Sequence, residues 1–526
     1  MPLSLKNTSA SLYTPSRSDD KPYAMFSNRL KRKKLRLCAL LCLSYPILCA
    51  QSAQEDNSTK SALNALAEAE KARLSENSAN AQTNTQEKCE GDCALQTQFN
   101  EEAVLLGVDP LSLITVTPGG PPVRIPIAIP DTLALGADTS RELAQTLIQV
   151  IRNDLTMSGL FEIMPPETYA LVNTAKEGIV PSTIQFDAWY NIGASVLIKT
   201  HYSQEGGHDN FGFSVFNVDA ASNLPFKYEN KTLTENNVRA VAHDFANKLI
   251  GFYTGTDGVF GSRILFAAQG KSNFRKIQSF DTDGFGLQTY DLPQAINVMP
   301  EWGPNGSILF TQLSQKSDNI YVYRKGNETE LRQLTDFEGW ASGADYCPKN
   351  GKIAFTGARE QNGNIYVMNS DGSELVQLTD MPDSIQTSPS WSPDCSQLAF
   401  VSNYSGKPQI YVINADGSGM RRLTWVGNYN TTPDWSPKGD LIAFTARDER
   451  NVFDIFTIHV KSGEVTRLTQ DQGHNREPSW SPDGRYLVFE STRDGKQPRL
   501  YLMNSDGRWQ TRISATPGLK TPTWKN

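Results

Sequence analysis

The second half of the chain alternates short apolar runs with polar turns, and one aromatic-containing phrase returns at a nearly constant interval. Because only 9 of the 526 residues are Trp, five tryptophans at one repeat position are not a chance arrangement. Successive copies are separated by 44, 45, 44, 45 and 44 residues, and the aromatic residues are Trp302, Tyr346, Trp391, Trp435, Trp480 and Trp524. The pattern predicts a repeated structural unit.

Each copy has the pattern of four short antiparallel strands. In "EPSWSPDGRYLVF" (residues 477–489) the apolar runs flank "SPDG", where Pro presets φ, Asp accepts hydrogen bonds from nearby amides and Gly tolerates positive φ. A third strand such as "QIYVINADG" (409–417) ends in an Asp-Gly hairpin, and a fourth such as "MRRLT" (420–424) follows. Four strands in 44 to 45 residues match the length of a β-propeller blade.

The count of strands predicts six blades. The repeat region opens with apolar segments at 263–268, 275–284 and 287–290 that lack a preceding Trp strand. The chain supplies such a strand at its other end, as "KTPTW" (520–524). We therefore expect the C-terminal strand to complete the first blade and close the ring, which removes exposed strand edges. The repeated aromatic residue is expected to pack between neighbouring blades.

Residues 111–258 have a different pattern, in which helices alternate with strands. The segment "VRIPIAIPD" (123–131) predicts a strand, which its prolines favour at a sheet edge. Thr139 and Glu142 form a capping-box pattern before a helix whose apolar residues recur at helical spacing up to Leu155. Further strands are predicted at 195–201 and 211–218, and a second helix ends near Gly251 with the buried stripe Val238, Val241, Phe245 and Leu249. The chain is thus predicted to form a small α/β N-terminal domain (111–258) followed by an all-β six-bladed propeller (259–526).

The first 110 residues predict export. A basic run at residues 29–36 precedes 14 apolar residues at 37–50, which is the pattern of a signal peptide and shorter than the roughly 20 residues that span a bilayer. Residues 1–50 are predicted to be this signal peptide, with a possible start at Met25. Residues 51–110 are rich in Ala, Gln and Ser with almost no aromatic side chains, so we expect a disordered tether. The mature protein is expected to be soluble, without a transmembrane segment.

Charge and cysteine usage narrow the function further. A net charge of −7 and a pI near 5.5 argue against a nucleic-acid partner, because proteins that bind nucleic acids present a basic surface to the phosphates. After removal of the signal peptide four cysteines remain in an oxidising compartment, where pairing is possible. These are Cys89, Cys93, Cys347 and Cys395.

The sequence offers little for catalysis, and we predict that the chain is not an enzyme. It contains no Gly-x-Ser-x-Gly, no His-Glu-x-x-His and no P-loop. "FDTDGFG" (280–286) resembles part of a calcium loop but lacks the remaining ligands, so it is predicted to be a turn. No metal ligand is predicted. The five histidines are scattered, and we expect them to be packing or surface residues: His201, His208, His243, His459 and His474.

Binding is the better supported hypothesis. Alternating strands place the short turns on one propeller face, while the connections between blades and the loops between second and third strands lie on the other. Varied loops on a rigid scaffold suit partner recognition. The predicted partner contacts are Gln386, Thr387, Asn428, Tyr429, Asn430, His474, Asn475 and Arg476.

Four acidic residues are predicted to begin innermost strands and to make the channel mouth acidic, where a cation could bind weakly. They are Glu301, Asp345, Asp434 and Glu477. No other cofactor is expected.

A signal peptide, a small α/β domain and six repeats of the kind "PSWSPDG…LAFVS…IYVINADG…RLT" together resemble the TolB family, periplasmic components of the Tol-Pal system of Gram-negative envelopes. The resemblance covers residues 113–526 and includes "RIPIAIPD" and "AHDFANKLIGFYTGTDGVFGSRI". It implies a monomeric, non-enzymatic scaffold whose propeller binds the peptidoglycan-associated lipoprotein Pal. It also implies communication with TolA and a role in outer-membrane invagination and integrity during division.

Two alternatives stay open at the level of sequence. Similar repeat phrases occur in propellers that accompany peptidases, and a glycan- or peptidoglycan-binding propeller would carry the same pattern. Family members usually begin close to the segment that matches residues 113–130, whereas residues 51–112 precede it here. The mode of contact with TolA is therefore the least defined part of the resemblance.

Overall fold

The computed structural model describes residues 124–524, apart from 136–140, 173, 175–176, 206–207, 271–273, 327–329, 338, 359–361, 382 and 448–449. The predicted signal peptide and tether, the cysteines Cys89 and Cys93 and the capping residue Thr139 lie outside the described residues. Both domains described below fall within one compact unit of the chain, Pro110–Asn526.

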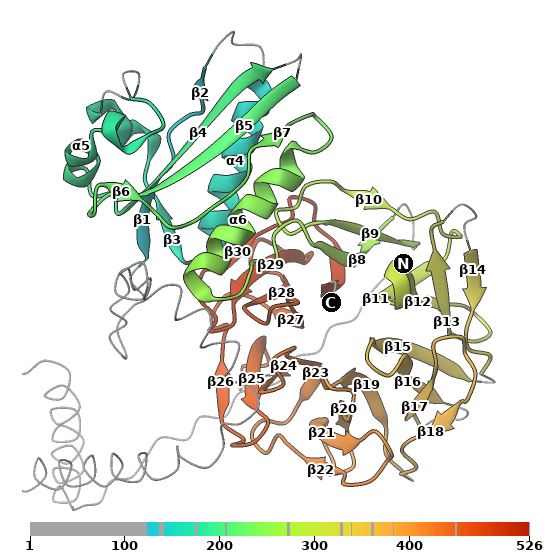
Figure 1. Ribbon diagram of the computed structural model, residues 1–526. Coiled ribbons are helices and arrows are strands. Elements are labelled where there is room, and N and C mark those ends of the chain that lie inside the picture. The colour runs from blue at the N-terminus through green and yellow to red at the C-terminus, as the bar shows by residue number, and fades with distance from the viewer. Residues whose placement is uncertain are drawn as a thin grey trace, which may run out of the picture. The chain divides into compact units, whose positions relative to one another are not determined.

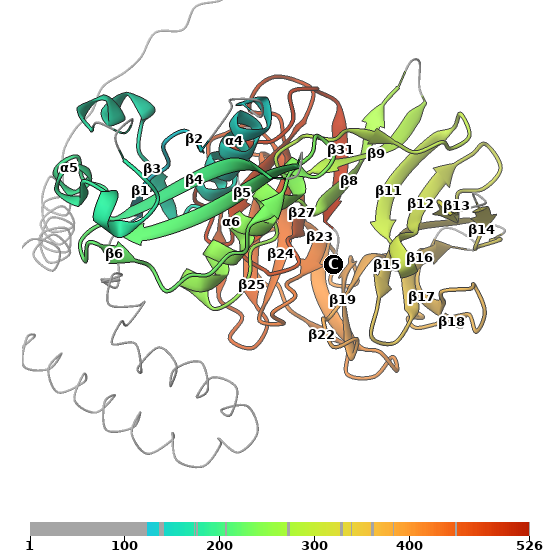
Figure 2. The ribbon, with the colours of Figure 1, turned by 45° about the horizontal axis from the view of Figure 1, so that its top comes forward.

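The N-terminal domain is a mixed sheet covered on both faces (Figures 1 and 2). One core holds helices α4 and α6 against Ile127 and Ile198, and a second holds Trp189 of α5 against Leu197 and Phe216. The strand order is β3-β1-β4-β5-β6, with β2 beside β4 and β7 beside β5. The strands are β1 (Ile125–Ala128), β2 (Leu133–Ala134), β3 (Phe161–Ile163), β4 (Val196–Glu205), β5 (His208–Asn217), β6 (Ser222–Asn223) and β7 (Lys231–Thr232), and the helices are α4 (Arg141–Met157), α5 (Phe186–Asn191), α6 (Val238–Thr254) and the short 3-10 turns η2 (Pro166–Leu171) and η4 (Pro181–Thr183).

The expectation that β1 is an edge strand is wrong. β1 pairs in parallel with β3 on one side and with β4 on the other. Pro126 costs no ladder bond because pairing with β4 begins one residue later, at Ile127 and Val196, while the Pro126 carbonyl still accepts a hydrogen bond from the Ser195 N–H at 3.0 Å. A proline is thus tolerated inside the sheet where its missing N–H meets no acceptor.

The two predicted helices are confirmed, and one of their ends is corrected. In α4 the residues Leu147, Val150, Ile151 and Leu155 are buried as the spacing predicts. α6 continues past Gly251 to Thr254, and the residue in left-handed conformation at its end is Gly255, at φ 78°. A Gly outside the left-handed region does not end a helix, so the second glycine of the segment is the true C-terminal signal.

The propeller strands run around a common centre, with β11, β15, β19, β23 and β27 innermost (Figure 1). Four separate sheets have four antiparallel strands each: β15 (Trp340–Cys347) to β18 (Val376–Gln377), β19 (Gln386–Trp391) to β22 (Arg421–Arg422), β23 (Asn430–Trp435) to β26 (Val465–Arg467), and β27 (Asn475–Trp480) to β30 (Thr511–Arg512). The second and third strands of these four sheets are, in chain order, β16 (Lys352–Ala358), β17 (Asn364–Asn369), β20 (Gln397–Ser402), β21 (Gln409–Asn414), β24 (Leu441–Arg447), β25 (Phe453–His459), β28 (Tyr486–Ser491) and β29 (Arg499–Asn504).

The remaining strands form one eight-stranded sheet rather than two separate blades. It contains β31 (Leu519–Trp524), β8 (Arg263–Gln269), β9 (Arg275–Asp281) and β10 (Gln288–Thr289), followed by β11 (Ile296–Trp302), β12 (Ile308–Leu313), β13 (Asn319–Arg324) and β14 (Glu330–Gln333). A single parallel pair, Ile296 with Arg275, joins the two antiparallel groups of four. The described propeller strands therefore divide into five sheets.

The predicted ring closure is confirmed. β31 pairs antiparallel with β8, so the last strand of the propeller lies beside the first. Trp524 is 1% exposed, and its indole Nε1–H donates to Ser262 Oγ at 2.7 Å. Trp391, Trp435 and Trp480 at the same repeat position are also buried, which supports their predicted packing role, while Trp302 and Tyr346 are half-buried.

A disulfide joins two neighbouring sheets. Cys347 at the end of β15 is bonded to Cys395 in the turn after β19, with a Cα–Cα distance of 6.1 Å. Cys347 stands where other repeats have Ser392 or Ser436, and Cys395 stands where they have Gly439. The sequence left the state of these two cysteines open, and the structure bonds them to each other.

The N-terminal domain packs against the propeller side that carries the short turns. A single apolar core contains Phe245 of α6 together with Tyr486 and Trp524. The Arg485 guanidinium, in the turn before β28, donates to Thr254 Oγ1 at 2.7 Å and to the Thr256 carbonyl at 2.6 Å.

Candidate functional site

The propeller has two unlike faces. We call "loop face" the side formed by the connections that enter innermost strands and by the loops between second and third strands, such as 403–408, 423–429, 450–452, 468–474 and 492–498. We call "short-turn face" the opposite side, formed by the turns after innermost strands and by the hairpins between third and fourth strands, such as 415–420 and 460–464. The predicted partner contacts belong to the loop-face ends of β19, β23 and β27.

Three of the predicted contacts gather around one aromatic side chain that the sequence analysis did not select. The Arg476 guanidinium lies 4.0 Å from the centre of the Phe453 ring. Tyr429 meets Phe453 edge-on at 5.7 Å, and the His474 ring lies 5.8 Å from it. Arg447 stacks over Tyr429 at 5.1 Å. We call these five residues the aromatic–arginine cluster.

The cluster draws on three separate segments of chain. Tyr429 precedes β23, Phe453 begins β25, and His474 and Arg476 flank the start of β27. His474 is fixed because its Nδ1 accepts a hydrogen bond from the Phe453 N–H at 3.3 Å. An aromatic residue two positions after the polar sequence "RDERN" (447–451) was the signal that could have pointed to Phe453, but Tyr429, His474 and Arg476 lie more than 20 residues away in sequence.

Three other predicted contacts do not present surface side chains. Gln386, Asn430 and Asn475 are at most 1% exposed. The Asn430 Nδ2–H donates to Gln409 Oε1 at 2.9 Å, and the Asn475 Nδ2–H donates to Asp454 Oδ1 at 2.9 Å. Their placement as surface contacts is therefore corrected. The amides of Asn430 and Asn475 tie an innermost strand to the sheet before it, whereas the Gln386 amide donates to Ser384 Oγ at 2.7 Å.

The repeat itself explains why these amides are buried. Asn297, Gln386, Asn430 and Asn475 occupy one repeat position, and all four are buried. A polar residue that recurs at the repeat spacing serves the unit that repeats, because its buried environment recurs too.

The last two predicted contacts lie apart from each other. Asn428 is exposed, and its side-chain oxygen accepts from Arg447 Nη2 at 3.4 Å. Thr387 is half-buried on β19, at the repeat position that Arg476 occupies on β27. A groove of about 390 Å³ beside Asn428 is lined by Val426, Phe456 and Arg467 among others.

The loop face also exposes apolar side chains that the sequence analysis did not select. Tyr404 is 61% exposed, Trp425 is 72% exposed and Val426 is 80% exposed. Arg422 lies 4.6 Å from the Trp425 ring centre. Trp, Tyr and Arg are the residue types that most often dominate protein–protein binding energy. Trp425 does not lie at the repeat position of the other tryptophans, and this was the feature of the sequence that could have indicated a role outside the repeated core.

The central channel is built by one backbone irregularity that each innermost strand repeats. The pairing register shifts by one residue between Val298 and Glu301 of β11, and at the equivalent place in the other five. The bulged residue has positive φ, as for Glu477 at 53°. Such bulges redirect side chains, and here the residues around them line a cavity of about 170 Å³.

Three of the four acidic residues lie near the ends of innermost strands, and Glu477 is the third residue of β27, so none begins its strand as predicted. Glu301, Asp345 and Asp434 share the repeat position directly before the aromatic residue. Glu477 belongs to a different layer, at the bulged position two residues earlier. All four line the channel cavity.

The layer of three carboxylates also holds neighbouring sheets together. Asp345 Oδ2 accepts from the Trp391 N–H at 2.5 Å, and Asp434 Oδ2 accepts from the Trp480 N–H at 2.7 Å. At the same position in two other strands, Ser390 accepts from the Trp435 N–H and Ser479 accepts from the Trp524 N–H. Asp345 and Asp434 thus link neighbouring sheets, in addition to any role in the channel.

Burial shapes the electrostatics of this channel. Desolvation raises the pKa of Asp345 and of Asp434 to about 7. Desolvation and then the neighbouring Asp345 charge raise the pKa of Glu301 well above its usual value. Desolvation, followed by the charge of Glu490, raises the pKa of Glu477 to about 7. A cation in the channel would compete with protons near neutral pH.

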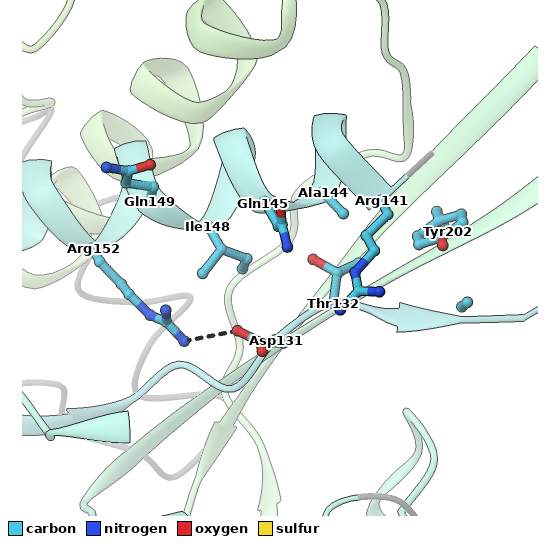
Figure 3. Close-up of a pocket in the computed structure, with 10 residues that line it drawn as sticks. Asp131, Thr132, Arg141, Ala144, Gln145, Ile148, Gln149, Arg152 and Tyr202 are labelled. Carbon is cyan, nitrogen blue, oxygen red and sulfur yellow. Dashed lines mark hydrogen bonds and ion pairs between the residues drawn. The ribbon is translucent and has the colours of Figure 1, made fainter. Parts of the chain in front are cut away.

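A further pocket, of about 640 Å³, lies in the N-terminal domain (Figure 3). Helix α4 contributes Arg141, Gln145 and Arg152, and the chain after β1 contributes Asp131, which pairs with Arg152 at 3.4 Å. The lining combines cationic, amide and apolar groups without a nucleophile paired to a base among the residues drawn, so it suits binding rather than catalysis.

Comparison with protein families identifies both domains. Residues 252–526 match the model described as the TolB beta propeller domain, and residues 113–224 match the TolB amino-terminal domain. A TolB protein of the Tol-Pal system from Myxococcus xanthus is 40% identical over 339 residues, which cover 64% of this chain and 77% of the relative. The chain belongs to the TolB family.

Other members of the TolB family agree with this assignment. A Tol-Pal system protein TolB from Geobacter sulfurreducens is 34% identical over 184 residues, which cover 35% of this chain and 41% of the relative. The crystal structure of TolB from Acinetobacter baumannii shares the fold, with a TM-score of 0.65 and 22% identity over 77% of this chain and 97% of that chain. TolB proteins are Tol-Pal components without enzymatic activity, and among the described residues no helix is long and apolar enough to cross a membrane.

Proposed function

We propose that this chain is a periplasmic scaffold that binds the lipoprotein Pal through the loop face of its propeller. The observation that carries the proposal is the aromatic–arginine cluster together with the exposed Trp425 and Tyr404, all on the loop face. Rigid aromatic and arginine side chains supply contact area at low entropy cost. The proposal includes communication with TolA through the N-terminal side and a role in division, and similarity to Tol-Pal system proteins supports both.

The use of the two faces supports this choice. The short-turn face is engaged by the N-terminal domain through Arg485 and Tyr486, whereas the loop face carries Tyr404 and Trp425, which are 61% and 72% exposed. We also infer six blades, because the eight-stranded sheet consists of two antiparallel groups of four joined by one residue pair. The six innermost strands and their six bulges surround one cavity.

The proposal is tested by titrating the soluble domain of Pal into the purified protein in a calorimeter. Arg476→Glu is expected to weaken binding by about 30-fold, which corresponds to about 2 kcal/mol. Lys461→Glu is the matched control, because it reverses one exposed charge in the β25–β26 hairpin on the short-turn face. It should leave the affinity within about threefold of the wild-type value.

Three results would contradict the proposal. Equal loss of affinity in both variants would indicate a general charge effect, and loss in Lys461→Glu alone would place Pal on the short-turn face. Binding of peptidoglycan fragments with no binding of Pal would favour the alternative of a glycan-binding propeller.

A further inference from the structure

Among the residues that the structure describes, one group of His and Asp side chains has the spacing of a metal site, and it lies where the two domains meet. One ring nitrogen of His243 and one carboxylate oxygen each of Asp281 and Asp283 lie within 4.8 Å of one another. His243 belongs to α6 of the N-terminal domain, and the two aspartates end β9 and begin its hairpin in the propeller.

His243 is held as metal-binding histidines are held. Its Nδ1 lies 2.7 Å from Asp154 Oδ2 of α4, and Asp154 is fully buried. The histidine is 4% exposed, and its Nε2 is buried without a hydrogen-bond partner. When the Nδ1–H donates to the carboxylate, Nε2 carries a lone pair, which is the arrangement of carboxylate–histidine–metal triads.

The ring cannot turn away from this position easily. Gly261 of the propeller has φ +82°, and a Cβ there would lie 3.1 Å from the His243 ring. The imidazole is thus packed between Asp154 and the start of the propeller, and its unpartnered nitrogen is left to the aspartates.

The two aspartates keep acceptor capacity for a cation. Arg263 bonds Asp281 through Oδ1 at 2.7 Å, and Arg239 pairs with Asp283 through Oδ2. Each carboxylate therefore has a second oxygen not used by its arginine. Three carboxylates, those of Asp154, Asp281 and Asp283, lie with two guanidinium groups, those of Arg239 and Arg263, around this site.

Asp283 accepts a backbone hydrogen bond as its counterparts in equivalent hairpins do, here from the Phe285 N–H at 3.1 Å, but it also lies beside a histidine. Asp371 and Asp416 stand at the same place before a Gly, and each accepts from the backbone and hydroxyl of a serine two residues later. Asp506, its counterpart in the last hairpin, pairs with its neighbour Arg508. Asp283 alone of these four is grouped with a histidine.

We propose that His243 Nε2, Asp281 and Asp283 bind one divalent transition-metal cation, with Zn²⁺ as the best-fitting ion, and that Asp154 orients the histidine. Ligands on one zinc lie about 3.3 Å apart in tetrahedral geometry, and rotation of the two aspartate side chains closes the observed spacing. One imidazole with two carboxylates favours zinc over calcium, which takes oxygen ligands. A water molecule would complete the site.

Such a site would fasten α4 and α6 to the first propeller strands through one ion. The sequence analysis interpreted "FDTDGFG" as a turn because no further ligand lay nearby in sequence. The structure supplies that ligand from a histidine 38 residues before Asp281. The inference is independent of whether the loop face binds Pal.

The test uses the full chain, stripped of metal with a chelator and titrated with Zn²⁺ in competition with a chromophoric chelator. We expect one zinc per chain with a Kd of about 1 µM or tighter and a rise in Tm when zinc is added. Asp281→Asn and Asp283→Asn should each weaken zinc binding at least about tenfold. Asp506→Asn is the matched control, since it alters the equivalent hairpin and its arginine pair without a histidine.

His243→Gln should also abolish the site, and Asp154→Asn should weaken it about tenfold through the orientation of the ring. If His243→Gln does not fold, the two hairpin variants carry the test, because they lie at half-buried positions. Absence of zinc binding would overturn the proposal. Zinc binding that survives both hairpin substitutions, or falls equally in Asp506→Asn, would also overturn it by placing the ion elsewhere.

Discussion

The two faces of the propeller differ in what their aromatic side chains do. On the short-turn face Trp509 packs against the N-terminal domain, since Gly159 leaves room for its ring and Arg124 stacks on it at 3.3 Å. On the loop face Trp425 is 72% exposed. Neither tryptophan belongs to the repeat, so each marks a use that the repeated unit does not need. This difference is the one expected if the short-turn face serves stability and the loop face serves recognition, as proposed above.

The covalent link of the ring and several of its buried polar links lie on one side, although the buried amides of Asn430 and Asn475 join sheets near the loop face. The disulfide, the carboxylate hydrogen bonds to Trp391 and Trp480 and the Arg485 contacts all lie toward the short-turn side. If this division is correct, substitutions on the two sides will separate stability from binding.

The largest effect is expected where the ring closes. Trp524→Ala removes a side chain that is 1% exposed and bonded to Ser262, so the free energy of unfolding should fall by about 3–5 kcal/mol. Trp425→Ala should change it by less than about 0.5 kcal/mol, because an exposed ring buries little area. Denaturant unfolding measures both, and similar losses in the two variants would refute the division.

The disulfide should contribute almost as much. Reduction is expected to lower the free energy of unfolding by about 2–4 kcal/mol. The double variant Cys347→Ser with Cys395→Gly should lose less, because Cys395 has φ 61° and Gly adopts this conformation without strain. Thermal unfolding with and without reductant tests this, and an unchanged Tm on reduction would show that the link is dispensable.

Partner affinity should respond on the loop face alone. Trp425→Ala and Tyr404→Ala are each expected to weaken Pal binding by about 1–2 kcal/mol while stability is retained. Met420→Ala, in the β21–β22 hairpin of the short-turn face, is the control for loss of a partly exposed apolar side chain. A larger loss of affinity in the control than in the two aromatic variants would reverse the assignment of faces.

The smallest effect is expected in the channel. A carboxyl group with a pKa near 7 in the folded state binds a proton that the unfolded state has lost, so stability rises as pH falls from about 7 toward 4. Asp434→Asn keeps an acceptor for the Trp480 N–H and removes the charge. It should stabilise the protein by about 1 kcal/mol at pH 8, after allowance for screening, and weaken the pH dependence. Unfolding at pH 8 and pH 5 measures both quantities.

Much of the architecture could be predicted because the same strand and turn pattern occurs in every copy of the repeat. The strands, the turn residues and closure by β31 follow from periodic features that each copy confirms. The joining of β9 to β11 could not be predicted, since it depends on one parallel pair that no repeated residue specifies. The edge position of β1 failed for a related reason, because the register with β4 decides whether Pro126 interrupts a ladder.

The candidate site was predicted less completely. Loop positions led to Tyr429, His474 and Arg476, which do meet around Phe453. The same reasoning selected Asn430 and Asn475, although their recurrence at the repeat spacing indicated burial. The contacts of His243 with Asp154 and the propeller hairpin join residues 38 to 89 positions apart in sequence, and no periodicity connects them.

We propose that the loop face is the surface that binds Pal. Hydrogen–deuterium exchange, measured with and without Pal, reports which peptides of the propeller the partner covers. We predict slower exchange in peptides that cover 403–408, 424–430 and 450–476, with little change in the hairpins at 415–420 and 460–464 once overlapping peptides are resolved. Protection confined to the short-turn hairpins, with the loop peptides unchanged, would show that Pal binds the short-turn face and not the loop face.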